Sequence, residues 1–194
     1  MTNAPEATEA PEATEALAAP PAPAATPAPA PPAYRDLDEP GRRAWMEAAI
    51  RTYFDGCNEA DTAKTAAGFH PDAVHYFPPG LDGPWTGAAT IAAHWRRLTL
   101  TIGSAWTIDR LITDPATHQA VIEWTHYKTA PGGFLRGDEW YAFDPDTGLI
   151  TEIRAYYASR SDGRDHVELE GFDYGARGYQ LSCPVDRPHP DAQY

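Results

Sequence analysis

Two adjacent segments in the C-terminal half constrain the fold of this chain more than any other feature. Residues 138–143 and 149–158 have the composition of strands, and the turn formers of 144–148, Asp-Pro-Asp-Thr-Gly, separate them. The pattern predicts an antiparallel hairpin. Because side chains alternate across a strand, Glu139 and Tyr141 are expected on the same face. A carboxylate beside aromatic rings on a buried face indicates a pocket that carries chemistry.

The rest of the folded region is predicted to be helices followed by strands. Helical spacing begins near Pro40 and lasts about five turns, with Trp45, Ala48 and Tyr53 on the apolar side. A short helix capped by Asp61 and a third from Ala88 to about Thr99 follow. The expected strands are 73–77, 105–113, 119–129, 135–143 and 149–158, with a loop over 78–87. This order predicts an α+β fold in which a strongly curved antiparallel sheet wraps around three helices.

The two ends of the chain differ from this region. Residues 1–34 contain nine of the twenty prolines and a tandem repeat of Ala-Pro-Glu-Ala-Thr-Glu, a composition that predicts a disordered arm. We therefore expect one folded domain at 35–160. We also expect a C-terminal extension, 161–194, that packs partly on this domain through its aromatic residues.

Charge and composition exclude several classes of function. The net charge of -13, with 15 basic residues, argues against nucleic acid and against anionic membranes. No apolar run is long enough to span a bilayer, and the N-terminus lacks the pattern of a signal peptide, so we expect a cytoplasmic protein. Cys57 and Cys183 have no metal-binding spacing and are expected to be free thiols.

Several stretches, in this order, resemble the NTF2-like superfamily, and in particular its SnoaL-like, ketosteroid-isomerase-like branch. The resemblance covers residues 42–158 and is carried by Ala-Ile-Arg-Thr-Tyr-Phe-Asp-Gly-Cys-Asn-Glu-Ala-Asp at 49–61, Phe-His-Pro-Asp-Ala-Val-His-Tyr at 69–76, Val-Ile-Glu-Trp at 121–124 and Gly-Leu-Ile-Thr-Glu-Ile-Arg-Ala-Tyr-Tyr at 148–157. It implies a cone-shaped barrel that admits a small hydrophobic or aromatic substrate, a homodimer, and no cofactor or metal.

The resemblance also implies catalytic positions. The steroid isomerase's two hydrogen-bond donors to the enolate oxygen correspond to Tyr53 and Glu139, whereas its general base corresponds to Phe77. His75 or His126 would then serve as the base, because imidazole titrates near neutral pH. A glutamic acid surrounded by aromatic rings stays protonated more easily, which is the reason a carboxyl group can donate in ketosteroid isomerase, the worked example of this effect. The expected substrate-binding residues are Phe77, Trp95, Trp124, Tyr141, Ile153 and Tyr157.

Other interpretations stay open at this point. A one-residue shift of register would turn Asp138 inward in place of Glu139. Tyr53 and the histidines also suit purely structural roles. A metal site is disfavoured because its candidate ligands have no short-range spacing typical of a metal site; these candidates are His75, His94, His126 and Glu139. The leading hypothesis is an isomerase, cyclase or dehydratase acting on an enolisable carbonyl compound. A binding protein without turnover is the alternative, and an interaction module is a third possibility.

Overall fold

The structure, a computed structural model, describes residues 32–78, 83–131, 134–157, 169 and 171–178. The expectations for the arm up to residue 31, for most of the 161–194 extension and for Cys183 lie outside the described residues. Cys57 is a buried free thiol. Among the described residues, no helix combines the length and the apolarity needed to cross a membrane.

The helices begin where capping side chains are placed. A short 3-10 helix, η1 (Tyr34–Asp36), precedes α1 (Glu39–Glu59), whose first turn is capped by Asp38, the acceptor of a 2.9 Å hydrogen bond from the Gly41 amide. Asp61 caps α2 (Thr62–Ala66) in the predicted way, through a 3.0 Å bond from the amide of Lys64. The third predicted helix is α3, Ala88–Ile102.

The strands form one six-stranded sheet in the order β2-β1-β6-β5-β4-β3. The last four strands are a continuous antiparallel meander, as predicted. The fold is the expected α+β arrangement, although β2 and β3 are open edges, so that the described part of the sheet does not close into a barrel. The bounds are β1 Phe69–Tyr76, β2 Trp85–Thr86, β3 Ser104–Asp114, β4 Gln119–Lys128, β5 Phe134–Phe143 and β6 Ile150–Tyr157.

Two details of the sheet differ from the sequence prediction. Strand β1 runs parallel to β6, so the sheet is mixed and not wholly antiparallel. Because no hairpin connects β1 to β6, the chain between them is long enough to allow either direction. The expected loop over 78–87 also contains β2, where Thr86 and Trp85 pair with Val74 and His75.

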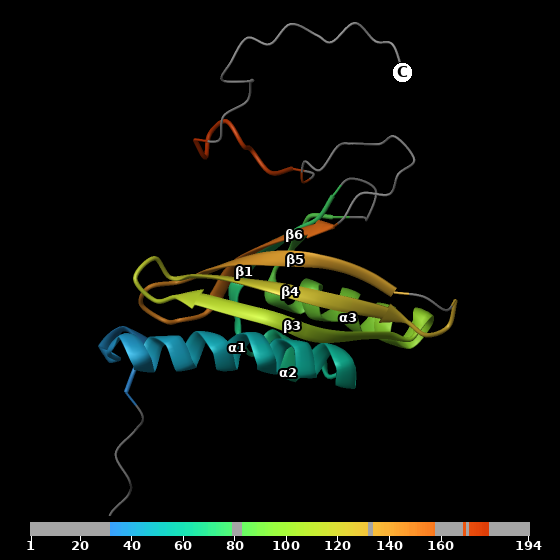
Figure 1. Cartoon of the computed structure of the whole chain (residues 1–194), viewed down its shortest axis with the longest axis horizontal. Helices are drawn as coiled ribbons and strands as arrows, with labels where there is room; N and C mark the ends of the chain where they lie inside the picture. Colours follow the sequence, from blue (N-terminus) through green and yellow to red (C-terminus); the bar gives the residue numbers. More distant parts are fainter. Residues whose placement is uncertain (1–31, 79–82, 132–133, 158–168, 170, 179–194) are drawn as a thin grey trace, which may run out of the picture. The chain divides into compact units, whose positions relative to one another are not determined.

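All three helices lie on the same face of the sheet, with α1 along β3 (Figure 1). The buried side of α1 consists of Met46, Ile50, Tyr53, Phe54 and Cys57. The predicted apolar face is therefore shifted, since Trp45 is 39% exposed and Ala48 is exposed. Tertiary packing selects the side that faces the sheet, and the Trp45 indole N–H instead donates to the Gly148 carbonyl at 3.0 Å.

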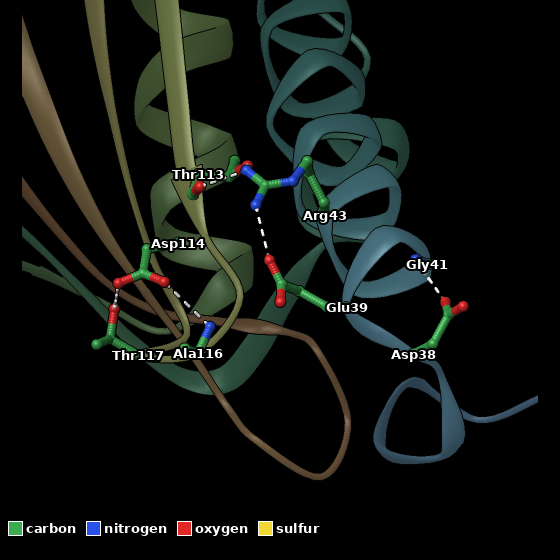
Figure 2. A network of polar contacts seen from close by, with 8 residues as sticks. All are labelled: Asp38, Glu39, Gly41, Arg43, Thr113, Asp114, Ala116 and Thr117. Atoms are coloured by element: carbon green, nitrogen blue, oxygen red, sulfur yellow. Dashed lines mark hydrogen bonds and ion pairs between the residues drawn. The ribbon is translucent and has the colours of Figure 1, made fainter.

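A polar contact ties the start of α1 to the end of β3 (Figure 2). Arg43 donates to the Thr113 carbonyl oxygen at 2.7 Å and forms an ion pair with Glu39 at 3.1 Å. The guanidinium group thus holds the helix against the sheet edge, on the side where β3 turns into β4.

Residues from the C-terminal segment contact the other end of the sheet. Phe172 is buried and packs edge-on against Tyr76 of β1, with ring centroids 5.2 Å apart. Arg177 forms a 2.6 Å ion pair with Glu152 of β6, and its guanidinium lies 4.1 Å from the Phe172 ring centroid. These contacts connect the segment to the parallel β1–β6 pair.

Candidate functional site

The register of the meander turns Glu139 towards the helices. Glu139 on β5 pairs with Ile122 of β4 and Ala155 of β6, and only 4% of its surface is exposed. The neighbouring Trp140 is 41% exposed, because it occupies the opposite face. The alternative register, with Asp138 inward, is therefore not the one adopted.

Two side chains, those of Tyr141 and His75, lie close to the Glu139 carboxyl group but do not line the main pocket. The Tyr141 hydroxyl donates a hydrogen bond to Oε2, and the His75 Nε2 atom lies 3.6 Å from Oε1. Burial, followed by the negative charge of Glu139, raises the pKa of Tyr141 well above its usual value. Tyr141 therefore stays a neutral phenol and a permanent donor to the carboxyl group.

His75 belongs to the core and not to the pocket wall. Its side chain is fully buried and stacks in parallel on Phe77, with ring centroids 4.0 Å apart. Neither ring nitrogen has a hydrogen-bond partner in the described part of the chain. The sequence predicted that His75 points inward, and the structure places it against Glu139 but away from the space in which a ligand would lie.

A pocket of about 220 Å³ lies between α3 and the concave face of the sheet. Its walls are mainly aromatic, and Glu139 is the one acidic side chain among the described residues that line it. Of the expected substrate-binding residues, Phe77, Trp95, Trp124 and Tyr157 line it, whereas Tyr141 and Ile153 are fully buried behind it. The remaining lining residues are Trp85, Arg97, Leu98, Ile102, Trp106, His126, Lys128 and Leu135.

His126 also lines this pocket. Its Nε2 atom is 2.8 Å from the Ser104 hydroxyl oxygen, and its ring stacks on Trp106 with centroids 4.5 Å apart. Burial, assisted by the positive charge of Lys128, lowers the pKa of His126 to about 4. The imidazole is therefore neutral at pH 7, and it is a weaker base than an ordinary histidine.

Tyr53 lies on the other side of Glu139. It lines a second cavity of about 10 Å³ together with Cys57 and Glu139, roughly the volume that a single water molecule needs. Burial raises the pKa of Tyr53 well above its usual value, with further contributions from Cys57 and Glu139. The structure thus brings Tyr53 near Glu139 but separates its ring from the main pocket.

Sequence reasoning missed the charged residues of the pocket, Arg97 and Lys128. The signal for Lys128 was present, since it lies two residues beyond His126 and four beyond Trp124 on one face of a predicted strand. Arg97 had no comparable signal, because it follows the apolar stripe of a helix. Within the described residues, no group of three or more histidine, cysteine, aspartate and glutamate side chains is placed to hold a metal ion.

Comparison with known proteins finds relatives for the fold. The SnoaL-like domain family matches residues 50–153, while no curated protein matches. A protein of unknown function with a cystatin-like fold from Methylobium petroleophilum PM1 is 53% identical, with a TM-score of 0.71 over 75% of this chain and 97% of that chain.

Two further solved structures have much lower identity. An NTF2-like protein of unknown function from Mesorhizobium loti is 17% identical, with a TM-score of 0.52 over 61% of this chain and 94% of that one. A putative polyketide cyclase from Xanthomonas campestris pv. campestris is 15% identical, with a TM-score of 0.50 over 60% and 92%. At such identities the likeness shows the fold alone. The family match spans more than half of the chain and agrees with the observed fold, and the chain therefore belongs to the SnoaL-like domain family.

Proposed function

We propose that this protein is an enzyme that moves a proton on a small, enolisable carbonyl compound, in an isomerisation, cyclisation or dehydration. The observation that carries the proposal is the Glu139 carboxyl group, which is 4% exposed and lines an aromatic pocket. A carboxyl group in such surroundings is suited to general acid and base chemistry, because the pocket excludes water.

Glu139 is a better candidate for the base than either histidine. His75 does not line the pocket, and the stacked Phe77 ring lies beside it. His126 does line the pocket, but its Nε2 atom is engaged with Ser104 and its pKa is about 4. The family resemblance implied that protonated Glu139 donates a hydrogen bond to a developing oxyanion, whereas the geometry supports a role in which Glu139 takes up and returns the proton.

The residues behind Glu139 act as positioning residues. A hydrogen bond from Tyr141 holds Oε2, and the His75 imidazole packs with Nε2 3.6 Å from Oε1, beyond hydrogen-bond distance. Trp124 supplies an apolar wall for the substrate, since its ring lines the pocket, while its indole N–H is buried and has no partner among the described residues.

The test is the exchange of substrate hydrogen with deuterated solvent. Propiophenone and 4-oxo-4-phenylbutanoate each carry a C–H bond next to a ketone, and NMR follows the exchange of that hydrogen. We expect the wild type to accelerate exchange of at least one probe, and Glu139→Gln to lower the rate by about 10² to 10⁴. Glu123→Gln is the matched control, because Glu123 is exposed on the same sheet. An unchanged rate in Glu139→Gln would contradict the assignment.

Binding without turnover is a second candidate, and one observation favours it. Phe77, which corresponds to the base of the steroid isomerase, forms part of the pocket wall, so that position offers no proton acceptor. A carrier or sensor of aromatic metabolites would bind both probes and leave their hydrogens unexchanged. That result, with Glu139→Gln and wild type binding equally, would replace the enzyme proposal with this one.

A further inference from the structure

The pocket has more hydrogen-bond donors than acceptors. Two basic side chains, Arg97 and Lys128, line the pocket, and neither forms an ion pair with a described residue. In a chain with 28 acidic and 15 basic residues, two uncompensated cations at an aromatic pocket are unexpected. Two cations at an aromatic pocket favour a ligand that carries a negative charge on acceptor oxygens.

Arg97 is held in place without losing its charge. Its guanidinium donates to the Nδ1 atom of His94 at 3.0 Å, so this imidazole nitrogen is a neutral acceptor. The His94 ring in turn stacks on Trp85, with centroids 4.3 Å apart and planes 8° from parallel. This stack connects Arg97 to the pocket wall, and the positive charge stays available to a ligand.

Lys128 lies at the end of the pocket away from Glu139. Trp124, His126 and Lys128 are on one face of β4, and Ile122, which pairs with Glu139, comes two residues before Trp124. Residues two apart on a strand are about 7 Å apart, so the backbone at Lys128 is about 20 Å from the Glu139 pair.

The size of the pocket limits what can span it. A volume of about 220 Å³ is below the roughly 300 Å³ at which pockets for drug-sized ligands begin, whereas a protein cavity of about 150 Å³ holds benzene. One aromatic ring with short substituents fits. Two single cations around so small a space match a monoanion, and a carboxylate accepts from both in the geometry that a guanidinium prefers.

We infer that the ligand is a one-ring aromatic keto acid, with its carboxylate between Arg97 and Lys128 and its ring among the aromatic side chains of the pocket. This inference rests on the proposed function, for which it specifies the substrate class. The arrangement keeps the two negative charges, that of the ligand carboxylate and that of Glu139, at opposite ends of the pocket.

The experiment compares two ligands that differ only in charge. Dissociation constants of 4-oxo-4-phenylbutanoate and its uncharged amide are measured by quenching of tryptophan fluorescence, since four tryptophans line the pocket. We expect the carboxylate to bind about tenfold more tightly. Arg97→Met and Lys128→Met should each weaken its binding about fivefold and change that of the amide less than about twofold. Arg51→Met, which removes an exposed charge from α1, is the matched control.

The outcomes separate this inference from the proposed function. Equal affinity for the two ligands, or an equal effect of Arg51→Met and Arg97→Met, overturns the anion site even if both ligands exchange hydrogen with solvent. A carboxylate preference that depends on Arg97 and Lys128 supports the site. If the bound carboxylate then keeps its hydrogens, the proton-transfer function fails and the anion site stands.

Discussion

Gly137 of β5 is expected to be essential for the shape of the pocket. A Cβ atom at this position would lie 2.6 Å from Cζ2 and 3.0 Å from Cη2 of Trp124, and it would also meet the Tyr156 carbonyl oxygen. The closest indole atom is therefore about 0.8 Å inside the 3.4 Å at which ordinary contact begins. Because Trp124 is 3% exposed and edge-on to Tyr157, it has little room to move. Overpacking of this kind costs about 1–3 kcal/mol.

Urea unfolding of Gly137→Ala measures this cost as a decrease in the free energy of unfolding. Gly68→Ala is the matched control, because a Cβ atom there would have no heavy atom nearer than 3.7 Å, and this variant should be neutral or stabilised by about 0.4–1 kcal/mol. The displaced indole should also weaken binding of 4-oxo-4-phenylbutanoate. If Gly137→Ala unfolds at the same urea concentration as Gly68→Ala, the packing argument for Trp124 is wrong.

Two further predictions concern pH and assembly. The pKa of His126 is about 4 in the folded protein against 6.5 for an ordinary histidine, so the unfolded chain binds more protons between these pH values. The free energy of unfolding should therefore decrease by up to about 3 kcal/mol from pH 6.5 to 4. In acid unfolding experiments, His126→Gln should make this decrease smaller. On the opposite face of the sheet, Ile112, Val121 and Trp140 are adjacent across three strands, with Ile112 67% and Trp140 41% exposed. We expect a homodimer across this face, which Trp140→Lys should convert to monomer in sedimentation equilibrium; a wild type that sediments as a monomer would refute this.

Local sequence was sufficient to predict the three α-helices, every strand except β2, and one face of the site. The turn at 144–148 separates two strands whose alternation places Glu139 and Tyr141 together, and the observed hairpin has this arrangement. Asp61 likewise predicted the start of α2, since a cap depends on the amides of the next three residues. Such features are set within a few residues, so they can be derived without knowledge of the fold.

The surroundings of Glu139 depended on contacts distant in sequence. His75 lies on β1, and the parallel pairing of β1 with β6 brings its imidazole close to the Glu139 carboxyl group. His75 therefore contacts Glu139 without lining the pocket. Arg97 and Lys128 line the same pocket because α3 packs against β1 and β3, and the sequence near either residue does not predict this packing. The helical phase of α1, which buries Met46 and exposes Trp45, was decided in the same way.

The physical reason for this division is the range of the forces involved. Alternation, capping and turn chemistry arise from the geometry of the backbone over a few residues, so the sequence by itself determined the α-helices, the meander strands and the shared face of Glu139 and Tyr141. Packing removes apolar area from water without regard to direction, so several helical phases and strand pairings would serve nearly equally well. Only the tertiary structure selected one of them, and with it the residues that share the pocket with Glu139.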